Sequence, residues 1–475
     1  MLNYLKRFFK IIGVFSGYFW QAFIKLRGCS QEITRSRAIL LRHSLERLGS
    51  VFIKFGQFLS LRPDLVPPEY CRELFYLLEN VPPFSENDVI RVFQEEFNTT
   101  PEKLFPMFKM TPVAAASFGQ VHEAYLKSGK KVAVKVQRPK IKELVRQDIR
   151  IMNFLAKIID VLPLGPNKLK PMIDQFKSWT LEELNYEIEA NYTEEFFNRC
   201  KENSEVIIPK IYRKFCSKRV LTAEFIEGIT LSNILLAIRN KDKDLLNRLS
   251  RLGFSRSKVA ETLLRTSVKQ IYFDGFFHAD PHPANIIFTP EKKLAYIDFG
   301  IVGTLNKKSR FACLRYTRSA LYGDTTTAFE ALTQLCDISN LRDIGSFKKV
   351  HDQIILETLN QVKNSKGNGD IHSLRQIIGR KLFKTMRIMQ KYGAIAPPDT
   401  LRYFRALSTL DNTVLELNPE MEISDIARKF RNISIANLIM ELPSLVNPKK
   451  FEENLLKCLN LIEKEIASNI KPPLG

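Results

Sequence analysis

Residues 278–303 restrict what this chain can fold into more than any other stretch. Asp280 is followed by Asn285, an apolar run, a charged turn, a second apolar run and Asp298-Phe-Gly. This order is typical of kinase-type sites, in which the first acid faces the attacking hydroxyl or water and the other two side chains hold Mg²⁺ through oxygen. Asp-Phe-Gly alone is also an ordinary strand exit, since glycine adopts unusual backbone angles. The order and spacing together favour a phosphoryl-transfer site on two short strands.

A second signal lies upstream, where a run of small residues precedes a strand that carries a lysine. The run is centred on Ala114-Ala115-Ala116-Ser117, and the strand contains Val-Ala-Val-Lys135. Small residues let backbone N–H groups approach phosphate. Lys135 stands where kinases place the lysine that contacts phosphate. A plain hairpin with an exposed lysine is the alternative, but the distance to Asp280 fits a small nucleotide-binding lobe.

Helices are expected over residues 140–159 and 170–200, and the second is rich in glutamate. A kinase lysine usually pairs with a glutamate on a helix, and Glu189 is the predicted partner of Lys135. The other glutamates of this helix also fit a solvated face. A strand that passes through Glu224 to Gly228 should leave the small lobe across a hinge, whose backbone could hold an adenine edge. Residues 255–273 predict an amphipathic helix leading to the site.

Residues 35–78 show helical spacing, interrupted at 62–64 and 67–68 by proline, which breaks helices. This region contains Lys54-Phe-Gly-Gln57, in which the Lys and Gln share a helix face and on spacing alone resemble a solvated pair. A further helix is expected over 85–97. After residue 303 the chain should be mostly helical, with breaks near 323–324, 366–370 and 396–399. The final segment, 451–466, keeps one apolar face.

The net charge of +21 calls for a negatively charged partner or surface: nucleic acid, anionic lipid or a polyphosphate ligand. No zinc-finger or RNP-type signature occurs, so nucleic acid is not expected. The seven scattered cysteines suit reduced thiols in a cytoplasmic protein.

The basic, aromatic residues 1–34 contain an uncharged run, 11–24, that is shorter than the ~20 apolar residues of a membrane span. This run suits a helix in the interface of a membrane. The alternative is a helix packed on the protein's own surface. The expected location is therefore cytoplasmic, peripheral on the inner face of a membrane, without a transmembrane helix.

Over roughly residues 35–303 the chain resembles the UbiB/ADCK family of atypical, protein-kinase-like proteins. Lys54-Phe-Gly-Gln57 is similar to the family's KxGQ motif, and residues 114–120 to its alanine-rich loop. Glu183-Leu-Asn185 falls at the ExD motif, although Asn185 replaces the expected carboxylate. Ala284 stands where many relatives have glycine. Bacterial members often end in transmembrane helices, and this chain has no such run, so any membrane attachment should be peripheral or through a partner.

The resemblance implies an α+β, two-lobed kinase-like fold, in which the KxGQ face covers the place where a protein substrate would dock. The expected segments are a basic aromatic segment, a helical extension, an N-lobe, a C-lobe and a helical tail: 1–34, 35–105, 106–228, 229–440 and 441–475. The implied catalytic residues are Asp280, Lys54, Gln57 and Glu183. The implied nucleotide-binding residues are Ala114, Ala115, Ala116, Ser117, Lys135, Glu189 and Glu224, and the implied metal ligands are Asn285 and Asp298.

By the same resemblance the cofactors are ATP and Mg²⁺, and the activity is ATP hydrolysis coupled to membrane isoprenoid lipids in ubiquinone or other quinone biosynthesis. Possible partners are quinone-biosynthesis enzymes. Alanine in the phosphate loop restricts its backbone relative to glycine, and the KxGQ helix would obstruct a peptide, so protein phosphorylation is not expected. Two alternatives stay open. His278-x-Asp280 followed by Asn285 also fits a small-molecule or lipid kinase of the aminoglycoside or choline kinase type, and a nucleotide-binding scaffold with little turnover is the other.

Overall fold

A computed structural model describes residues 2–418 except 27, 29, 61, 63–64, 76, 78–81, 162–168, 366–383 and 390. Residues 1–419 form one unit.

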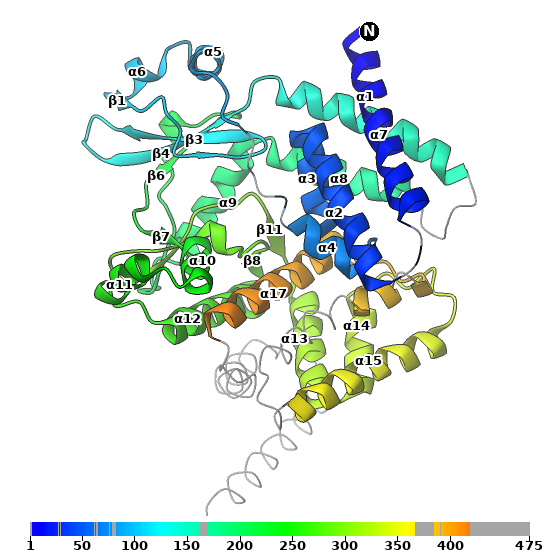
Figure 1. Cartoon of the computed structure of the whole chain (residues 1–475). Helices are drawn as coiled ribbons and strands as arrows, with labels where there is room; N and C mark the ends of the chain where they lie inside the picture. The colour runs from blue at the N-terminus through cyan, green and yellow to red at the C-terminus, as the bar shows by residue number, and fades with distance from the viewer. Residues whose placement is uncertain are drawn as a thin grey trace, which may run out of the picture. The chain divides into compact units, whose positions relative to one another are not determined.

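The first sheet is antiparallel and carries the predicted lysine on an inner strand. The strand order is β1-β3-β4-β6, with β2 also paired to β3 (Figure 1). The strands are β1 Met107–Phe108, β2 Ala114–Ala115, β3 Gly119–Tyr125, β4 Lys131–Gln137 and β6 Val220–Glu224.

Alternation along β4 decides which way Lys135 faces. Val132, Val134 and Val136 are fully buried in one cluster with Phe93 of α5 (Glu86–Phe97). Side chains alternate across a strand, so Lys135 lies on the opposite face from these valines. The helix α5 begins after the N-cap Ser85, whose hydroxyl accepts from the Asp88 N–H. The short helix α6 spans Pro101–Leu104.

In its described residues, the N-terminal extension consists of four α-helices and one π-helical turn. They are α1 Leu2–Phe19, a π-helical turn Trp20–Lys25, α2 Gln31–Leu48, α3 Ser50–Ser60 and α4 Pro68–Phe75. The sequence predicted helix across residue 49, but α2 ends there because Gly49 adopts φ +90°, a conformation that glycine tolerates. The predicted break before α4 is confirmed, since α4 begins at Pro68.

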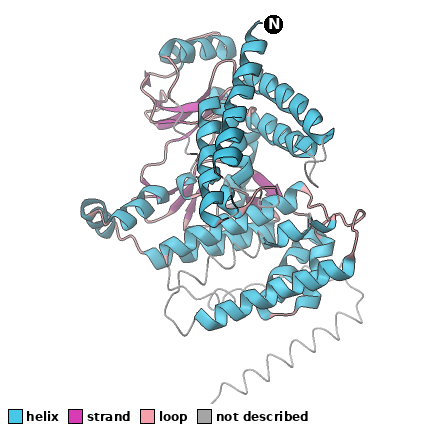
Figure 2. Cartoon of the chain, turned by 45° about the vertical axis from the view of Figure 1, so that its right-hand side comes forward, coloured by secondary structure: helices cyan, strands magenta, loops and turns pink. Residues whose placement is uncertain are grey.

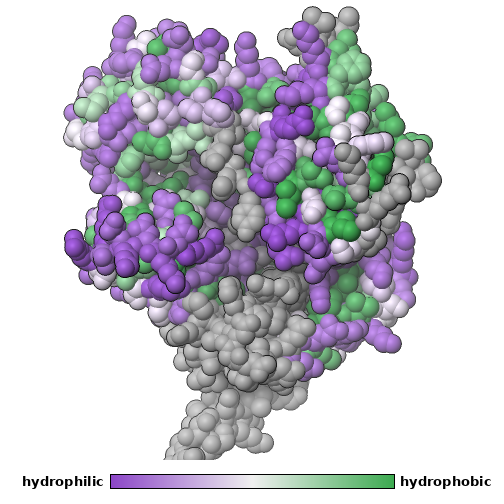
Figure 3. All heavy atoms as spheres, in the orientation of Figure 1, coloured by the Kyte–Doolittle hydropathy of each residue, from purple (hydrophilic) through white to green (hydrophobic). Residues whose placement is uncertain are grey.

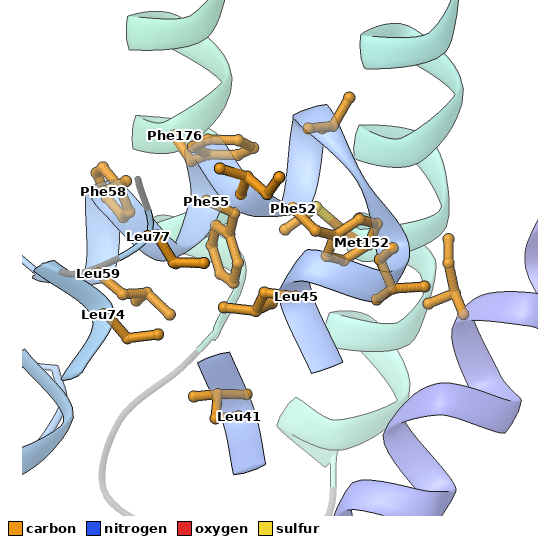
Figure 4. Close-up of a cluster of buried hydrophobic side chains, with 14 of the residues drawn as sticks. Leu41, Leu45, Phe52, Phe55, Phe58, Leu59, Leu74, Leu77, Met152 and Phe176 are labelled. Atoms are coloured by element: carbon orange, nitrogen blue, oxygen red, sulfur yellow. The ribbon is translucent and has the colours of Figure 1, made fainter. Parts of the chain in front are cut away.

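This extension shares one hydrophobic core with two later helices, α7 Ile141–Val161 and α8 Leu169–Glu183. Phe55 and Phe58 of α3 contact Phe176 of α8, with ring centroids 5.0 and 5.7 Å apart (Figure 4). Met152 of α7 belongs to the same cluster. Because these aromatic side chains are almost fully buried, the extension is packed into the fold as an integral part of it.

The helix predicted over 170–200 is two helices, so that prediction was wrong. After α8, the backbone of Asn185 is extended, with φ −119° and ψ 96°, and α9 spans Tyr186–Arg199. The Asn185 side chain accepts from the Glu187 N–H and so acts as the N-cap of α9. Asn and Asp are both favoured N-caps, so the amide at the ExD position performs the local structural task that an aspartate could perform.

The predicted pair of strands after Asn285 is confirmed. An antiparallel hairpin joins β9 Ile286–Phe288 to β10 Leu294–Tyr296. These strands are flanked by β5 Val206–Ile207 and β7 Ile229–Thr230, and a separate pair joins β8 Phe276–His278 to β11 Val302–Thr304. The strands thus lie in small groups among the helices (Figure 2).

Helices make up most of the remaining described chain, which confirms the predicted α+β class and helical C-terminal lobe. The predicted break at 323–324 is confirmed, because Gly323 ends α13 with φ +81° and Asp324 caps α14. The break at 366–370 and the apolar segment 451–466 lie outside the described residues. The helices are α10 Leu231–Asn240, α11 Lys243–Arg251, α12 Arg256–Val268, a π-helical turn Lys269–Asp274, α13 Lys307–Tyr322, α14 Thr325–Gln334, α15 Ile344–Ser365 and α17 Pro398–Leu417. Short 3₁₀ turns span Arg213–Phe215 and Pro283–Asn285.

A buried ion pair fixes the N-terminal helix α1 to α7. Arg7 donates from Nε to Asp148 Oδ1 at 2.8 Å and from Nη2 to Oδ2 at 2.5 Å. The Asp148 side chain is 0% exposed. Removing one partner of a buried pair leaves an uncompensated charge in the interior. One face of α1 therefore packs on the protein itself, as one of the two sequence-based alternatives proposed. None of the described helices is long and apolar enough to cross a membrane.

We expect Arg7→Ala to lower the free energy of unfolding by about 3–5 kcal/mol, because it leaves the Asp148 carboxylate buried without its charge partner. Urea unfolding followed by circular dichroism measures the change. The control is the double variant Arg7→Met with Asp148→Leu, which replaces the pair by apolar side chains and should recover most of the loss. An Arg7→Ala protein as stable as the parent would contradict the role given to this pair.

Candidate active site

Lys135 lies at the centre of the site, between two carboxylates from different parts of the chain. Its Nζ is 2.9 Å from each carboxylate oxygen of Glu189 on α9 and 3.4 Å from Asp298 Oδ2 after β10. Burial alone would lower the pKa of Lys135, but Asp298 and Glu189 hold it well above its usual value. The lysine is thus a fixed cation. Its Nζ also lies 5.1 Å from the centre of the Tyr186 ring, a cation–π contact.

Asp298 is held as a carboxylate by its surroundings. Burial raises its pKa, but Lys135 and the Gly300 N–H, which donates to Oδ1 at 2.9 Å, outweigh this effect and bring the pKa to about 2. Asp298 is therefore ionised at neutral pH. Its side chain is 43% exposed, so an ion could reach it.

His278 links the Asp280 loop to the Asp298 loop. Its Nε2 lies 2.5 Å from the Asp298 carbonyl oxygen, and the Asp280 N–H donates to its Nδ1 at 3.1 Å. These contacts require the neutral imidazole with its proton on Nε2. Burial lowers the pKa of His278, which favours that form. The Asn285 side chain donates to the Asp280 carbonyl at 3.4 Å, so the three predicted acid and amide residues stand on adjoining loops.

The Asp280 carboxylate is paired with Arg405, a residue that the sequence analysis did not single out. Arg405 of α17 places Nη2 at 2.7 Å from Asp280 Oδ2, and the Arg405 side chain is 9% exposed. Burial raises the pKa of Asp280, but Arg405 first, and then His282 and His278, bring it below its usual value. Arg405 is 125 positions away from Asp280 in the sequence and belongs to no motif, so only the fold reveals it.

Asn285 and Asp298 suit a magnesium ion that also takes phosphate oxygens. Among the described residues, no group of three or more His, Cys, Asp or Glu side chains could hold a metal ion. Magnesium needs no such cage, since it is usually bound by one or two protein ligands together with substrate phosphates and water. A carboxylate with a pKa of about 2 and a neighbouring amide oxygen fit that chemistry.

The alanine-rich loop is a tight turn above α9. Ala114 and Ala115 pair with β3, and the Ala116 N–H donates to the Gly119 carbonyl at 2.8 Å. A Cβ at Gly119 would lie 2.5 Å from Tyr186 Oη and 2.6 Å from the Val136 carbonyl oxygen, so the close approach requires glycine. Ser117, one of the predicted nucleotide-binding residues, is 2% exposed. Its hydroxyl is buried, whereas Ala114 is exposed and Ala115 and Ala116 are partly exposed.

Lys54 connects the helical extension to this loop. Its Nζ lies 2.5 Å from Glu183 Oε1 at the end of α8 and 5.8 Å from the centre of the Phe118 ring. Gln57, one turn later on α3, instead donates to the Leu77 carbonyl at 3.1 Å. The structure therefore brings Lys54 and Glu183 together, whereas Gln57 is engaged within the extension.

Glu224, the predicted hinge residue, is partly occupied by local contacts. Its N–H donates to the Lys210 carbonyl at 2.8 Å, and its carboxylate accepts from the Lys210 N–H at 3.3 Å. The carboxylate thus faces Lys210 and not the site lysine. A contact to a base at this position would have to use other backbone groups of the hinge. The end of the hinge is tight, since a Cβ at Gly228 would lie 2.3 Å from the Phe288 carbonyl oxygen.

The sheet with its lysine–glutamate pair and the acid, amide and acid on two adjoining loops define a protein of the kinase-like class. The match to the ABC1 atypical kinase-like domain over residues 76–332 identifies the family more closely. The chain belongs to this ABC1/UbiB family of atypical kinase-like proteins, which confirms the family resemblance found in the sequence.

Relatives are found in plants and bacteria. The chain is 31% identical over 431 residues to the Arabidopsis thaliana chloroplastic protein called Activity of bc1 complex kinase 3, covering 88% of this chain and 56% of that protein. It is 36% identical to an uncharacterised Synechocystis protein, covering 87% of this chain and 57% of that protein. It therefore spans little more than half the length of these relatives. An uncharacterised Clostridium pasteurianum protein is 30% identical, with 87% and 77% covered.

A solved structure supports the fold. The complex of Rv3197 with erythromycin from Mycobacterium tuberculosis superposes with a TM-score of 0.50 and 22% identity, covering 76% of this chain and 87% of that one. At this identity the likeness concerns the fold alone.

We expect Asp298→Asn to weaken Mg²⁺-dependent nucleotide binding about tenfold or more while the fold persists, because it removes the charged oxygen ligand of the proposed metal site. Titration with a fluorescent ATP analogue, with Mg²⁺ and with EDTA, measures the effect. Glu195→Gln, an exposed change on α9, is the control. Equal Mg²⁺-ATP affinity in the Asp298→Asn and parent proteins would count against this site.

Proposed function

We propose that this chain is an Mg²⁺-dependent ATPase that supports the biosynthesis of a membrane isoprenoid lipid such as ubiquinone or another quinone. The observation that carries the proposal is the cluster in which Lys135 touches both Glu189 and Asp298 beside the Asp280 loop. This is the arrangement of charges that phosphoryl transfer needs, a cation for phosphates and acids for metal and nucleophile.

Each side chain has a distinct task in this proposal. Lys135 holds phosphate oxygens, and Glu189 keeps its ammonium in place. Asn285 and Asp298 supply oxygen ligands, and the bound Mg²⁺ would neutralise charge on the transferring phosphoryl group. Asp280 orients the attacking water through hydrogen bonds. The backbone of the alanine-rich turn faces the phosphates, because its side chains are too small to obstruct them.

The ion pair between Lys54 and Glu183 supports water as the acceptor over a protein side chain. It ties α3 to the end of α8 and sets Lys54 beside Phe118 of the alanine-rich turn. A peptide that approached the phosphates from this side would have to separate an ion pair of 2.5 Å. A small nucleophile meets no such obstacle, so hydrolysis is favoured.

The outer face of the N-terminal helix supports contact with a membrane. Several aromatic side chains of α1 and the turn after it are about half exposed or more, although the opposite face is buried. Figure 3 shows hydrophobic residues gathered on the surface where α1 runs. The exposed aromatic side chains are Phe9, Phe19, Trp20 and Phe23. Lysines on the same helix and the net charge of +21 suit an anionic surface.

The lipid-linked role in this proposal rests on the family resemblance, and the cytoplasmic side of the membrane rests on the scattered cysteines. Isoprenoid lipid, quinone-biosynthesis enzymes as partners, and peripheral attachment are parts of the same proposal. The buried Arg7–Asp148 pair matters here, because it fixes the membrane-facing helix to α7. A membrane contact at α1 would thus act on a helix that shares its core with α3 and α8.

We expect phosphate release from Mg²⁺-ATP by the purified chain to exceed that of Asp298→Asn at least tenfold and to rise with anionic liposomes. A malachite-green assay measures the release. Bound nucleotide without release would favour the scaffold alternative. A phosphorylated small molecule or lipid in the reaction would favour the kinase alternative.

We expect Phe9→Ser with Trp20→Ser to reduce co-sedimentation with anionic liposomes severalfold and to leave nucleotide affinity unchanged, because both side chains point away from the core. Point changes are preferable to deletion of residues 1–30, which would also expose the Asp148 charge. Tyr322→Ser is the matched control, since Tyr322 is 66% exposed on the distant helix α13. Equal co-sedimentation of all three proteins would reject the membrane-facing helix.

A further inference from the structure

The ion pair between Arg405 and Asp280 joins the proposed catalytic loop to a helix from the far end of the described chain. Arg405 Nη2 and Asp280 Oδ2 are 2.7 Å apart. Arg405 is almost fully buried, and its Nε has no hydrogen-bond partner among the described residues. A buried guanidinium with a donor left unsatisfied costs free energy, which is the kind of cost that functional sites carry.

The loop fixes the backbone of Asp280 but leaves its carboxylate to Arg405. The Asp280 carbonyl accepts from the His282 N–H at 2.6 Å and from Asn285, and the Asp280 N–H donates to His278. None of these bonds involves the carboxylate. Arg405 binds the carboxylate directly at Oδ2, and the charges of His282 and His278 also lower its pKa. The direction of the carboxylate therefore depends on the placement of this guanidinium.

Helix α17 holds Arg405 rigidly. Tyr403, two positions earlier, is 0% exposed, and its hydroxyl lies 2.7 Å from Thr317 Oγ1 and 3.1 Å from Tyr272 Oη. At the end of the helix, Arg256 donates to the Leu417 carbonyl at 2.5 Å. Preorganised groups on rigid elements position a reacting group better than groups on loops, so α17 is well suited to aim the carboxylate.

We propose that Arg405 is a positioning residue, which binds Oδ2 of Asp280 and turns Oδ1 toward the nucleophile. The inference rests on the proposed function in that it assigns Asp280 the orientation of the attacking water. Loss of Arg405 frees the carboxylate to rotate, so the nucleophile is held less often in line with the phosphorus. Nucleotide binding is unaffected, because Lys135 and Asp298 do not contact Arg405.

Arg402, one turn earlier on the same helix, provides a matched comparison. It is 15% exposed and also has a buried Nε without a partner, but it pairs with Glu182 at 3.0 Å and Asp399 at 3.2 Å. If Arg405 merely stabilises α17, both arginines should behave alike. If Arg405 acts through Asp280, only its variants should show coupling to Asp280.

The test is a double-mutant cycle for turnover. Arg405→Gln should lower kcat for Mg²⁺-ATP about 10- to 100-fold, the scale of a misplaced catalytic group, with less than a threefold change in the Kd of the nucleotide. Arg405→Lys should retain more activity than Arg405→Gln, since it keeps the charge. Asp280→Asn should lower kcat strongly, and adding Arg405→Gln to it should cost no more than about twofold. Arg402→Gln and Asp280→Asn should act independently, so the kcat of that double variant should fall by the product of the two single-variant factors.

Three outcomes would overturn the inference: additive losses for Arg405→Gln and Asp280→Asn, a Kd change that accounts for the lost activity, or equal behaviour of the Arg402 and Arg405 variants. A parent protein without turnover would instead reject the proposed ATPase. In that case the same cycle is measured by the thermal midpoint Tm of four proteins: the parent, Arg405→Gln, Asp280→Asn and the double variant. A double variant that melts no lower than Asp280→Asn would support the pairing, and additive decreases in Tm would overturn it.

Discussion

The ion pairs of the Lys135 ammonium connect the two lobes. Lys135 sits on β4 of the small sheet, is held by Glu189 of α9, and reaches Asp298, which follows β10 in the other lobe. Two carboxylates around one partly buried cation fix its charge, and the same cation keeps Asp298 ionised. These three charged groups hold strand β4, helix α9 and the loop after β10 together in the folded chain.

Two further ion pairs join the helical extension to α7 and to the end of α8. Lys54 joins α3 to Glu183, which lies at the break between α8 and α9, a few residues before Glu189. Arg7 joins α1 to Asp148 on α7. Both pairs link helices of one shared core. Helix α3, which carries Lys54, and helix α1, which is proposed to contact a membrane, therefore pack in the same core. This packing offers a physical route by which a lipid surface could influence turnover.

Arg405 adds a third connection, from α17 to the carboxylate of Asp280. The proposed catalytic acid is thus paired with a residue of a helix that lies outside the stretch matched to the family domain, residues 76–332. The site is assembled from the small sheet, the catalytic loops and the C-terminal lobe. A residue outside the recognisable motifs, Arg405, therefore contacts a residue inside one of them, Asp280.

Local chemistry made much of the site predictable. Asp280, Asn285 and Asp298 are close in sequence, and two short apolar runs joined by a charged turn lie between Asn285 and Asp298. This order predicted that the three side chains lie close together in space. The Val-Ala-Val-Lys pattern likewise predicted that Lys135 lies on a strand, and β4 carries it. The break at Asn185 was missed, because the residues around it favour helix and only an N-cap contact ends it. The end of α2 was missed for a related reason, since the left-handed conformation of Gly49 is a property of the packed chain.

The sequence by itself determined the family, the kinase-like class and the residues that carry the proposed chemistry, because these depend on short spacings and on side-chain type. Only the tertiary structure decided that Arg405 pairs with Asp280 and that Asp148 pairs with Arg7. Arg7 and Asp148 are 141 positions apart. Ion pairs of such separation follow from how helices pack, and neither periodicity nor composition records which surfaces will meet.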